Sequence, residues 1–324
     1  MNAVPDLSVV MIAGAQRARA QRTADAIAAQ ATDASIELVV VDVAPEPAPL
    51  RLPESIRSRC IEASGSAAWG ALRAAGARVA AAPVVAFLED HCLPQAGWAA
   101  ALIEAHREGW AAVGYAFMPA NPGRWRSRAT LIAEYGFWAD PVNGGRATIL
   151  PGNNISYQRA LLLSLDNELD AVLGVDDNLH RRFAARGLES GIATQARVAH
   201  QELVGIGTTA KANFDYGRVL ASARRIDEGW SLERRLLYAA AAPLGAPALR
   251  AVRLLGSLRG RQPLWAQVVA AGPAIAAIWM ANAIGQAAGS LFGPGRAARR
   301  LVDWELTAER EPPAEALAAP QPAD

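Results

Sequence analysis

The chain has 324 residues, with 32 basic and 31 acidic side chains and a formal net charge of +1. This near-neutral balance gives no overall attraction to nucleic acid, and two cysteines are too few for a disulfide framework. The length suits one large α/β domain, alone or with an accessory segment. Residues 1 to 6 show no basic stretch leading into an apolar core, so we predict no cleaved signal peptide and a cytoplasmic N-terminal part.

The N-terminal two thirds alternate between predicted strands and predicted helices. Apolar runs predict buried strands at residues 7–13, 37–42, 84–88, 110–117 and 192–200. Periodic stretches predict helices at residues 19–31, 65–80, 98–108 and 178–186. Strands joined by crossover helices pair in parallel, so the sequence predicts an α/β fold with a doubly wound, mainly parallel sheet and flanking helices.

The predicted strand at 84–88 is followed by three polar side chains, Glu89, Asp90 and His91. Open α/β sheets bind ligands just beyond the carboxyl ends of such strands. Carboxylate oxygen and imidazole nitrogen together are suitable ligands for a divalent ion such as Mn²⁺ or Mg²⁺. Such an ion in turn is suited to binding a diphosphate. The alternative for this tripeptide is a solvated acidic turn.

The C-terminal third contains an uncharged stretch between Arg261 and Arg296. Its apolar run, residues 264–292, is longer than the roughly 20 helical residues that cross the hydrocarbon core of a bilayer. Arginines flank both ends, so charge does not choose an orientation for a single span. Three interpretations stay open: a membrane span, a re-entrant or interfacial hairpin bent at Pro273 or Gly285, and a buried helix pair of a soluble domain.

Two further C-terminal segments complete the organisation of the chain. A shorter apolar stretch, residues 236–249, contains two prolines and is expected to lie along a surface. The tail after Glu311 combines proline with alanine and is predicted to be disordered. We therefore divide the chain into an α/β domain at residues 1–225, an apolar helical, membrane-associating region at 226–305 and a disordered tail at 306–324.

Six short motifs follow one another along the predicted α/β domain. They are Asp42 at a strand end, Arg73-Ala74-Ala75-Gly76, Glu89-Asp90-His91, Gly152-Asn153-Asn154, Asp176-Asp177 with Leu179 and Arg182, and Val198-Ala199-His200. In this order they resemble an inverting family-two glycosyltransferase of the GT-A fold. The resemblance covers about residues 7 to 225 and implies a GT-A-like, mixed but mainly parallel sheet, to which the C-terminal third adds a helical membrane-associated segment.

The resemblance also implies roles for the residues in these motifs. Those implied to bind a nucleotide-diphosphate sugar donor are Ala13, Asp42, Arg73, Glu89 and Asp90. Those implied to hold a divalent metal ion, Mn²⁺ or Mg²⁺, are Glu89, Asp90, His91 and His200. Those implied to line the acceptor side are Gly152, Asn153 and Asn154.

The same resemblance implies that a carboxylate at the start of the predicted helix at 178–186 is the general base. Asp176 takes this role if Leu179 and Arg182 anchor the match, whereas Asp177 takes it if the acidic pair does, and we prefer Asp176. Both residues have an alternative explanation, because capping and the helix dipole favour acidic residues at a helix N-terminus.

Three positions depart from the family's pattern. Ala74 stands where the family has asparagine, His91 replaces a metal-binding aspartate and Val175 replaces an acidic residue. Imidazole is a good ligand for Mn²⁺, so His91 is compatible with the metal chemistry. Outside the motifs, His106 and His180 are expected to be solvated surface residues.

Together the motifs predict a glycosyltransferase that moves a hexosyl group, with inversion, to a lipid-linked or cell-surface glycan acceptor. The apolar C-terminal region implies membrane lipids as partners and a location at the cytoplasmic face of the inner membrane. The three departures keep an alternative open, a non-catalytic, membrane-anchored protein of this fold that binds a partner. A nucleotidyltransferase would carry a phosphate loop rich in glycine and lysine, which residues 13–17 do not supply.

Overall fold

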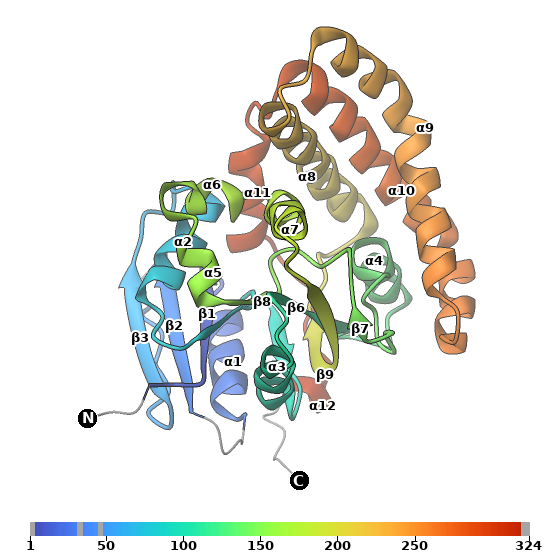
Figure 1. Cartoon of the computed structure of the whole chain (residues 1–324). Helices are drawn as coiled ribbons and strands as arrows, with labels where there is room; N and C mark the ends of the chain where they lie inside the picture. Colours follow the sequence, from blue (N-terminus) through green and yellow to red (C-terminus); the bar gives the residue numbers. More distant parts are fainter. Residues whose placement is uncertain (1–3, 31–34, 45–47, 319–324) are drawn as a thin grey trace. The chain divides into compact units, whose positions relative to one another are not determined.

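The computed structural model describes residues 4–30, 35–44 and 48–318, and the side chains within these ranges except those of Asp176 and Ala316 (Figure 1). The chain divides into two compact units. The first comprises Met1–Ala120, Asp140–His200 and Pro313–Asp324, and the second comprises Asn121–Ala139 and Gln201–Pro312. The second unit therefore takes in two parts of the region 1–225 that the sequence assigns to the α/β domain, residues 121–139 and residues 201–225.

One nine-stranded sheet forms the centre of the first unit (Figure 1). Its strands are β1 Leu7–Ala13, β2 Ile36–Asp42, β3 Arg57–Glu62, β4 Val84–Phe87, β5 Cys92–Pro94, β6 Ala112–Pro119, β7 Gly145–Arg146, β8 Ile155–Gln158 and β9 Ser190–His200. The order is β3-β2-β1-β4-β8-β6-β9-β5, with β7 beside β9. Strands β3, β2, β1 and β4 are parallel, as are β6 and β9, whereas β8 is antiparallel to both of its neighbours. This mixed, mostly parallel sheet confirms the predicted fold class.

The two central strands β1 and β2 are buried along their whole length because almost every side chain in them is apolar. Two of their polar residues satisfy each other, since Ser8 Oγ donates to the Glu37 carboxylate at 2.7 Å. Arg57 and Arg59 of β3 also lie 3.2 and 3.1 Å from that carboxylate. β3 is thus a half-exposed edge strand held partly by charge.

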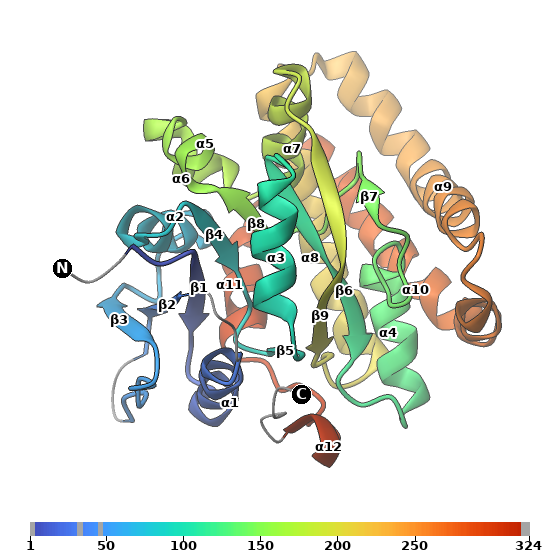
Figure 2. The ribbon, with the colours of Figure 1, turned by 60° about the horizontal axis from the view of Figure 1, so that its bottom comes forward.

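Helices of the first unit pack on this sheet. They are α1 Arg17–Ala28, α2 Trp69–Val79, α3 Trp98–Arg107, α5 Arg159–Leu163, α6 Leu169–Val172, α7 Asp176–Ala185 and α12 Glu315–Ala318, with a short 3-10 turn η1 Asp166–Glu168. α2 contacts β1 and β2, whereas α3 contacts β6, β8 and β9, along which it lies in Figure 2. The predicted strands and helices of this unit are all present, with ends shifted by a few residues.

Two strand registers bring distant polar residues together beyond β4. β4 and β8 pair so that Phe87 faces Ile155, which places Asn154 next to the chain that leaves β4. β5 and β9 pair so that Cys92 faces His200. The segment between β4 and β5 contains Glu89, Asp90 and His91, and these two pairings therefore surround it with side chains from β8 and β9.

The second unit is helical. Its helices are α4 Trp125–Tyr135, α8 Ile206–Asp227, α9 Leu232–Ser257, α10 Gln262–Phe292 and α11 Ala297–Leu306. α9 continues through both of its prolines, and α10 runs unbroken through Pro273 and Gly285, so the structure has no hairpin within the predicted apolar run. Among the described residues, α10 is the helix long and apolar enough to cross a membrane, and 39% of its most apolar window is buried.

Close contact between α8 and α10 depends on glycine. A Cβ atom added at Gly285 would lie 2.0 Å from the Phe214 carbonyl oxygen, and one at Gly289 would lie 2.1 Å from that of Arg218. Polar side chains secure the same contact, because Asn282 Nδ2 donates to the Asn213 carbonyl at 3.0 Å. The buried side of α10 is therefore a helix-packing surface and is only partly apolar.

The structure differs from the sequence expectations at His106 and in the C-terminal tail. His106 is 8% exposed, so its placement on a solvated surface is wrong: Nδ1 donates to the Trp110 carbonyl at 3.0 Å, and Nε2 lies 2.8 Å from Ser156 Oγ. The predicted disordered tail is described as far as residue 318, where it includes α12 and a hydrogen bond from Ala314 N–H to the Ala120 carbonyl at 2.8 Å. Residues 319–324 of that prediction lie outside the described part of the chain.

Candidate metal centre

Glu89 lies at the centre of the site and is 5% exposed. Asn154 holds it at two points: Oδ1 accepts from the Glu89 backbone N–H at 2.9 Å, and Nδ2 donates to the carboxylate. Asn153 Nδ2 donates to the other carboxylate oxygen at 2.8 Å. Both carboxylate oxygens are thus oriented by amide donors from the turn that precedes β8.

Two histidines and a cysteine surround the same carboxylate. His91 Nε2 lies 3.2 Å and His200 Nε2 lies 3.6 Å from Glu89 Oε2, and the two imidazole rings meet edge to face at 4.9 Å. Cys92 Sγ lies 3.9 Å from that oxygen. One ligand atom from each of the four residues lies within 4.8 Å of the others, and all four residues are buried. This is the geometry of a group that can hold a metal ion.

Asp90 has a different set of partners. Its carboxylate makes a buried ion pair with the Arg19 guanidinium of α1, with contacts of 2.8 and 3.0 Å, and lies 3.1 Å from His91 Nδ1. A carboxylate on the far nitrogen of a ligating histidine fixes the ring orientation and the tautomer. The structure therefore gives Asp90 the geometry of a residue that orients His91.

Opposing effects determine the charge of Glu89. Burial by itself raises the pKa of this carboxyl, but the adjacent His91 and His200 outweigh burial, and the pKa lies well below its usual range. Glu89 is therefore a carboxylate at neutral pH. Metal ions bind the deprotonated form, so the site presents its acidic ligand in the required state.

The donor chemistry distinguishes between the two ions that the sequence predicts. Mg²⁺ takes oxygen ligands and keeps several waters, whereas imidazole and thiolate ligands suit transition metals. The cluster offers one carboxylate, two imidazoles and one thiol. These residues fit a divalent transition metal better than they fit Mg²⁺. Cys92 belongs to no sequence motif, because its place beside His200 follows from strand pairing.

The residues implied to bind the donor each have a partner within the first unit. Asp42, at the end of β2, accepts two hydrogen bonds from the Arg17 guanidinium at 2.8 and 2.7 Å. Arg73, on α2, is buried, donates to the Leu173 carbonyl at 2.9 Å and lies over the Phe87 ring at 4.2 Å. Ala13 is fully buried at the end of β1 and faces Asp42 in the parallel register.

The segment Gly152-Asn153-Asn154, implied to line the acceptor side, lies against Glu89. Asn153 has φ of 62°, in the left-handed region that asparagine tolerates better than most residues. Its Oδ1 accepts from the indole N–H of Trp69, the first residue of α2, at 3.0 Å. Asn153 therefore connects α2 to the metal centre, a contact that the sequence motif did not indicate.

The two candidate bases begin α7. Asp176 is its first residue, and the placement of its side chain lies outside what the structure describes. Asp177 is half-exposed and lies 3.4 Å from the Arg181 guanidinium, one turn further along the helix. Arg182, which belongs to the same motif, pairs with Glu168.

Comparison with known proteins bears mainly on the fold. The sequence matches no protein-family model and no curated protein. The structure is similar to that of a mannosyltransferase from Pyrobaculum calidifontis in complex with GDP-Man and Mn²⁺, with a TM-score of 0.55 and 17% identity over 90% of this chain and 88% of that one. This likeness shows a fold of the GT-A type. Because it covers 90% of the chain, it extends beyond the first unit.

Two other solved structures are less similar. One is GalNAc-T7 with UDP, GalNAc and Mn²⁺, with a TM-score of 0.46 and 13% identity over 62% of this chain and 44% of that one. The other is glucosyl-3-phosphoglycerate synthase from Mycobacterium tuberculosis with Mn²⁺, UDP-glucose and glycerol 3-phosphate, with a TM-score of 0.45 and 17% identity over 70% of this chain and 81% of that one.

Proposed function

We propose that this chain is a metal-dependent glycosyltransferase that takes a hexosyl group from a nucleoside-diphosphate donor and transfers it with inversion. The observation that carries the proposal is the buried cluster of Glu89, His91 and His200 beyond β4, in a fold similar to that of a mannosyltransferase with GDP-Man and Mn²⁺. Ligands in such a sheet usually bind just beyond the carboxyl ends of the parallel strands.

Each residue of the cluster has a distinct task in this proposal. Glu89, His91 and His200 would hold the ion, which would neutralise charge on the diphosphate leaving group. Asn153 and Asn154 keep the Glu89 carboxylate in place, and Asp90 orients the His91 ring. The protein thus holds the metal-binding side chains in position before the metal and the donor bind. Groups held in this way can stabilise the charge of the transition state without rearranging during the reaction.

Inversion needs a base on the acceptor side of the sugar, and α7 offers two carboxylates for it. The ion pair of Asp177 with Arg181 gives Asp177 a structural role on the helix surface. We therefore assign proton abstraction from the acceptor hydroxyl to Asp176, as preferred from the sequence.

A lipid-linked or cell-surface glycan acceptor, and a location at the cytoplasmic face of the inner membrane, belong to the same proposal. Support comes from the second unit, where α9 and α10 expose many large apolar side chains, among them Leu237, Leu244, Val252, Val269 and Phe292. Between Glu233 and Asp303 the sequence contains arginine but no carboxylate. An apolar surface with cationic flanks suits an anionic leaflet.

A donor-cleavage assay tests the catalytic part. The full chain is incubated with a panel of GDP- and UDP-hexoses, with Mn²⁺ or with EDTA, and release of the nucleoside diphosphate is measured. We expect one donor to be cleaved in Mn²⁺ and not in EDTA, with the anomeric configuration of the product inverted by NMR. Metal-dependent donor binding without any transfer would instead favour the non-catalytic alternative.

A further inference from the structure

The side chains that contact the Glu89 carboxylate differ in exposure. Among the described residues, the buried ones are His91, Cys92, Asn154 and His200. The partly exposed one is Asn153, whose Nδ2 donates to Glu89 Oε1 at 2.8 Å. The metal centre is therefore closed by buried side chains except on the side of Asn153, and a ligand that reaches Glu89 approaches on that side.

Trp69, the first residue of α2, lies directly beside Asn153. Its indole N–H donates to Asn153 Oδ1 at 3.0 Å, and the same amide donates to Glu89. The indole ring is partly exposed, and within the part of the chain that the structure describes it makes no aromatic or cation–π contact. Two hydrogen bonds thus connect a partly exposed aromatic ring to the carboxylate of the metal centre.

The start of α2 is held against the segment that leads into α7. A Cβ atom added at Gly70 would lie 2.0 Å from the Asp170 carbonyl oxygen and 2.5 Å from the Gly174 backbone nitrogen, so this close approach requires glycine. α7 begins two residues after Gly174, at Asp176, the proposed base. Trp69 is therefore adjacent both to the metal centre and to the segment that precedes the base.

We propose that one face of the Trp69 ring stacks on the hexosyl group of the bound donor. In an in-line transfer the hexosyl group lies between the leaving diphosphate and the base that activates the acceptor. The C–H groups on one face of a hexopyranose are apolar, and the negative face of an indole ring attracts their hydrogens. The hydrogen bond to Asn153 holds the ring, so little side-chain freedom is lost when the sugar binds.

This inference rests on the proposed function and deepens it, because it names a residue that recognises the transferred sugar. The position of Trp69 favours the hexose over the nucleobase of the donor. The hexose is bonded directly to the diphosphate, whereas the ribose separates the base from it. A ring two hydrogen bonds from Glu89 is therefore placed to meet the hexose.

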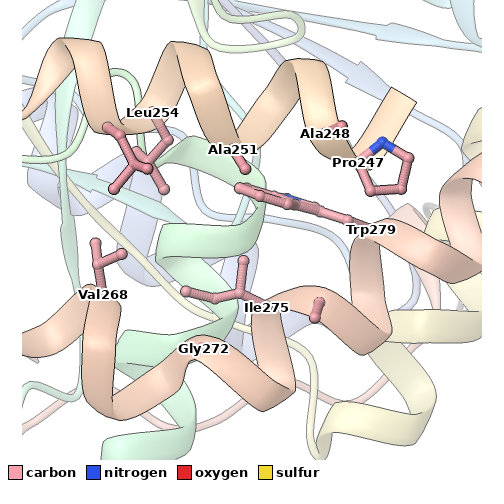
Figure 3. Close-up of a pocket in the computed structure, with 10 residues that line it drawn as sticks. Pro247, Ala248, Ala251, Leu254, Val268, Gly272, Ile275 and Trp279 are labelled. Carbon is pink, nitrogen blue, oxygen red and sulfur yellow. The ribbon is translucent and has the colours of Figure 1, made fainter. Parts of the chain in front are cut away.

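The apolar cavity between α9 and α10 in the second unit does not suit a sugar. Its volume is about 400 Å³, and its lining includes Leu254, Ile275 and Trp279 (Figure 3). None of the lining side chains is charged, and the Trp279 indole N–H donates to the Ala133 carbonyl at 2.8 Å. The hydroxyl groups of a sugar would lose their hydrogen bonds to water there without replacement.

Two variants of Trp69 isolate the aromatic face. Trp69→Phe and Trp69→Leu both lose the N–H that donates to Asn153, but only Trp69→Phe keeps an aromatic ring. The full chain is titrated by calorimetry in Mn²⁺ with GDP, GDP-mannose, UDP and UDP-glucose. The sugar nucleotide that the wild type binds should bind Trp69→Leu about three- to tenfold more weakly than Trp69→Phe, on the scale of one aromatic contact. Its parent diphosphate should bind the two variants within about twofold of each other.

The outcomes separate the hexose contact from the other roles of Trp69. Equal weakening of the diphosphate and the sugar nucleotide in Trp69→Leu overturns the hexose contact, because the ring would then bind the nucleotide. Equal affinities of Trp69→Phe and Trp69→Leu for the sugar nucleotide also overturn it and leave only the hydrogen bond to Asn153. Trp69→Met, also without a ring, should match Trp69→Leu and gives the same comparison if the latter does not fold. Absence of any nucleotide binding to the wild type overturns the proposed function together with this inference.

Discussion

Asn154 binds Glu89 through both ends of its amide, accepting from the Glu89 backbone N–H and donating to the Glu89 carboxylate. Asn154 is completely buried, so neither of these bonds can be replaced by bulk water. Groups that hold a metal ligand in place are typically worth about 10–100-fold in metal affinity. These two hydrogen bonds, which we call the Asn154 clamp, therefore connect the motif Gly152-Asn153-Asn154 to metal binding. The family resemblance implies instead that this motif lines the acceptor side.

Asn154→Ala should weaken Mn²⁺ binding by about 10–100-fold, because the Glu89 carboxylate loses one of its two amide donors. Isothermal titration of Mn²⁺ into the full chain measures this. Gln158→Ala is the matched control, since Gln158 ends the same strand but donates to the carbonyl of Trp110 at 3.0 Å. Unchanged Mn²⁺ affinity in Asn154→Ala, with the fold retained by circular dichroism, would refute the positioning role.

The two aspartates at the start of α7 can be separated by paired variants. Asp176→Asn should leave donor binding intact and lower kcat by about a hundredfold or more, the usual scale for loss of a general base. Asp177→Asn weakens a half-exposed ion pair with Arg181, worth at most about 0.5 kcal/mol of stability, and should change kcat by less than threefold. The opposite pattern would transfer the role of base to Asp177.

His106 predicts a measurable pH dependence of stability. Burial lowers the pKa of His106 to about 4, against a hydrogen bond to the Trp110 carbonyl that raises it. In the unfolded chain the pKa is near 6.5, so between about pH 6.5 and 4 the unfolded state binds a proton that the folded state excludes. Stability should therefore fall as the pH drops through this window, by about 3 kcal/mol between pH 7 and 4.

Urea unfolding at several pH values tests the contribution of this histidine. His106→Gln carries no titratable group, so the stability of this variant should fall less than that of the wild type by about the same 3 kcal/mol. The difference between the two proteins isolates His106 from every other group that titrates in this range. Parallel pH profiles would show that His106 is not buried in neutral form.

The α8–α10 contact predicts opposite effects at two glycines. Gly285→Ala forces a Cβ atom against the Phe214 carbonyl and should destabilise the second unit by about 1–3 kcal/mol. Gly256→Ala meets no atom within 4 Å and should stabilise its helix by about 0.5–1 kcal/mol. Thermal unfolding followed by circular dichroism measures both. Equal effects at the two positions would mean that α8 and α10 do not pack closely.

The central strands of the sheet were predictable because they are buried on both faces. Runs such as residues 7–13 carry apolar side chains on both sides of the strand, a pattern that surface segments do not show. β3, Arg57–Glu62, escaped the prediction because it is a half-exposed edge strand with alternating charges. α4 is likewise rich in arginine at its start, which obscured its apolar face.

The residues of the candidate site could be predicted from the sequence, but the role of each residue could not. Glu89 and His91 could be proposed from the end of one buried strand, and His200 from the end of another. The separation of Asp90 from the cluster depends on Arg19, which lies 71 residues earlier and shows no motif. The clamp by Asn154 depends on an antiparallel register that local sequence does not specify.

Metal-dependent binding of a nucleoside diphosphate is the most direct test of the account. GDP and UDP are titrated into the full chain by calorimetry, with Mn²⁺ and with EDTA, for the wild type, His91→Ala and the surface control Arg107→Ala. One diphosphate should bind the wild type and the control in Mn²⁺, and its affinity should fall at least tenfold in EDTA and in His91→Ala. Binding of equal strength in EDTA, or in His91→Ala with Mn²⁺, would contradict the assignment of this cluster as the metal centre.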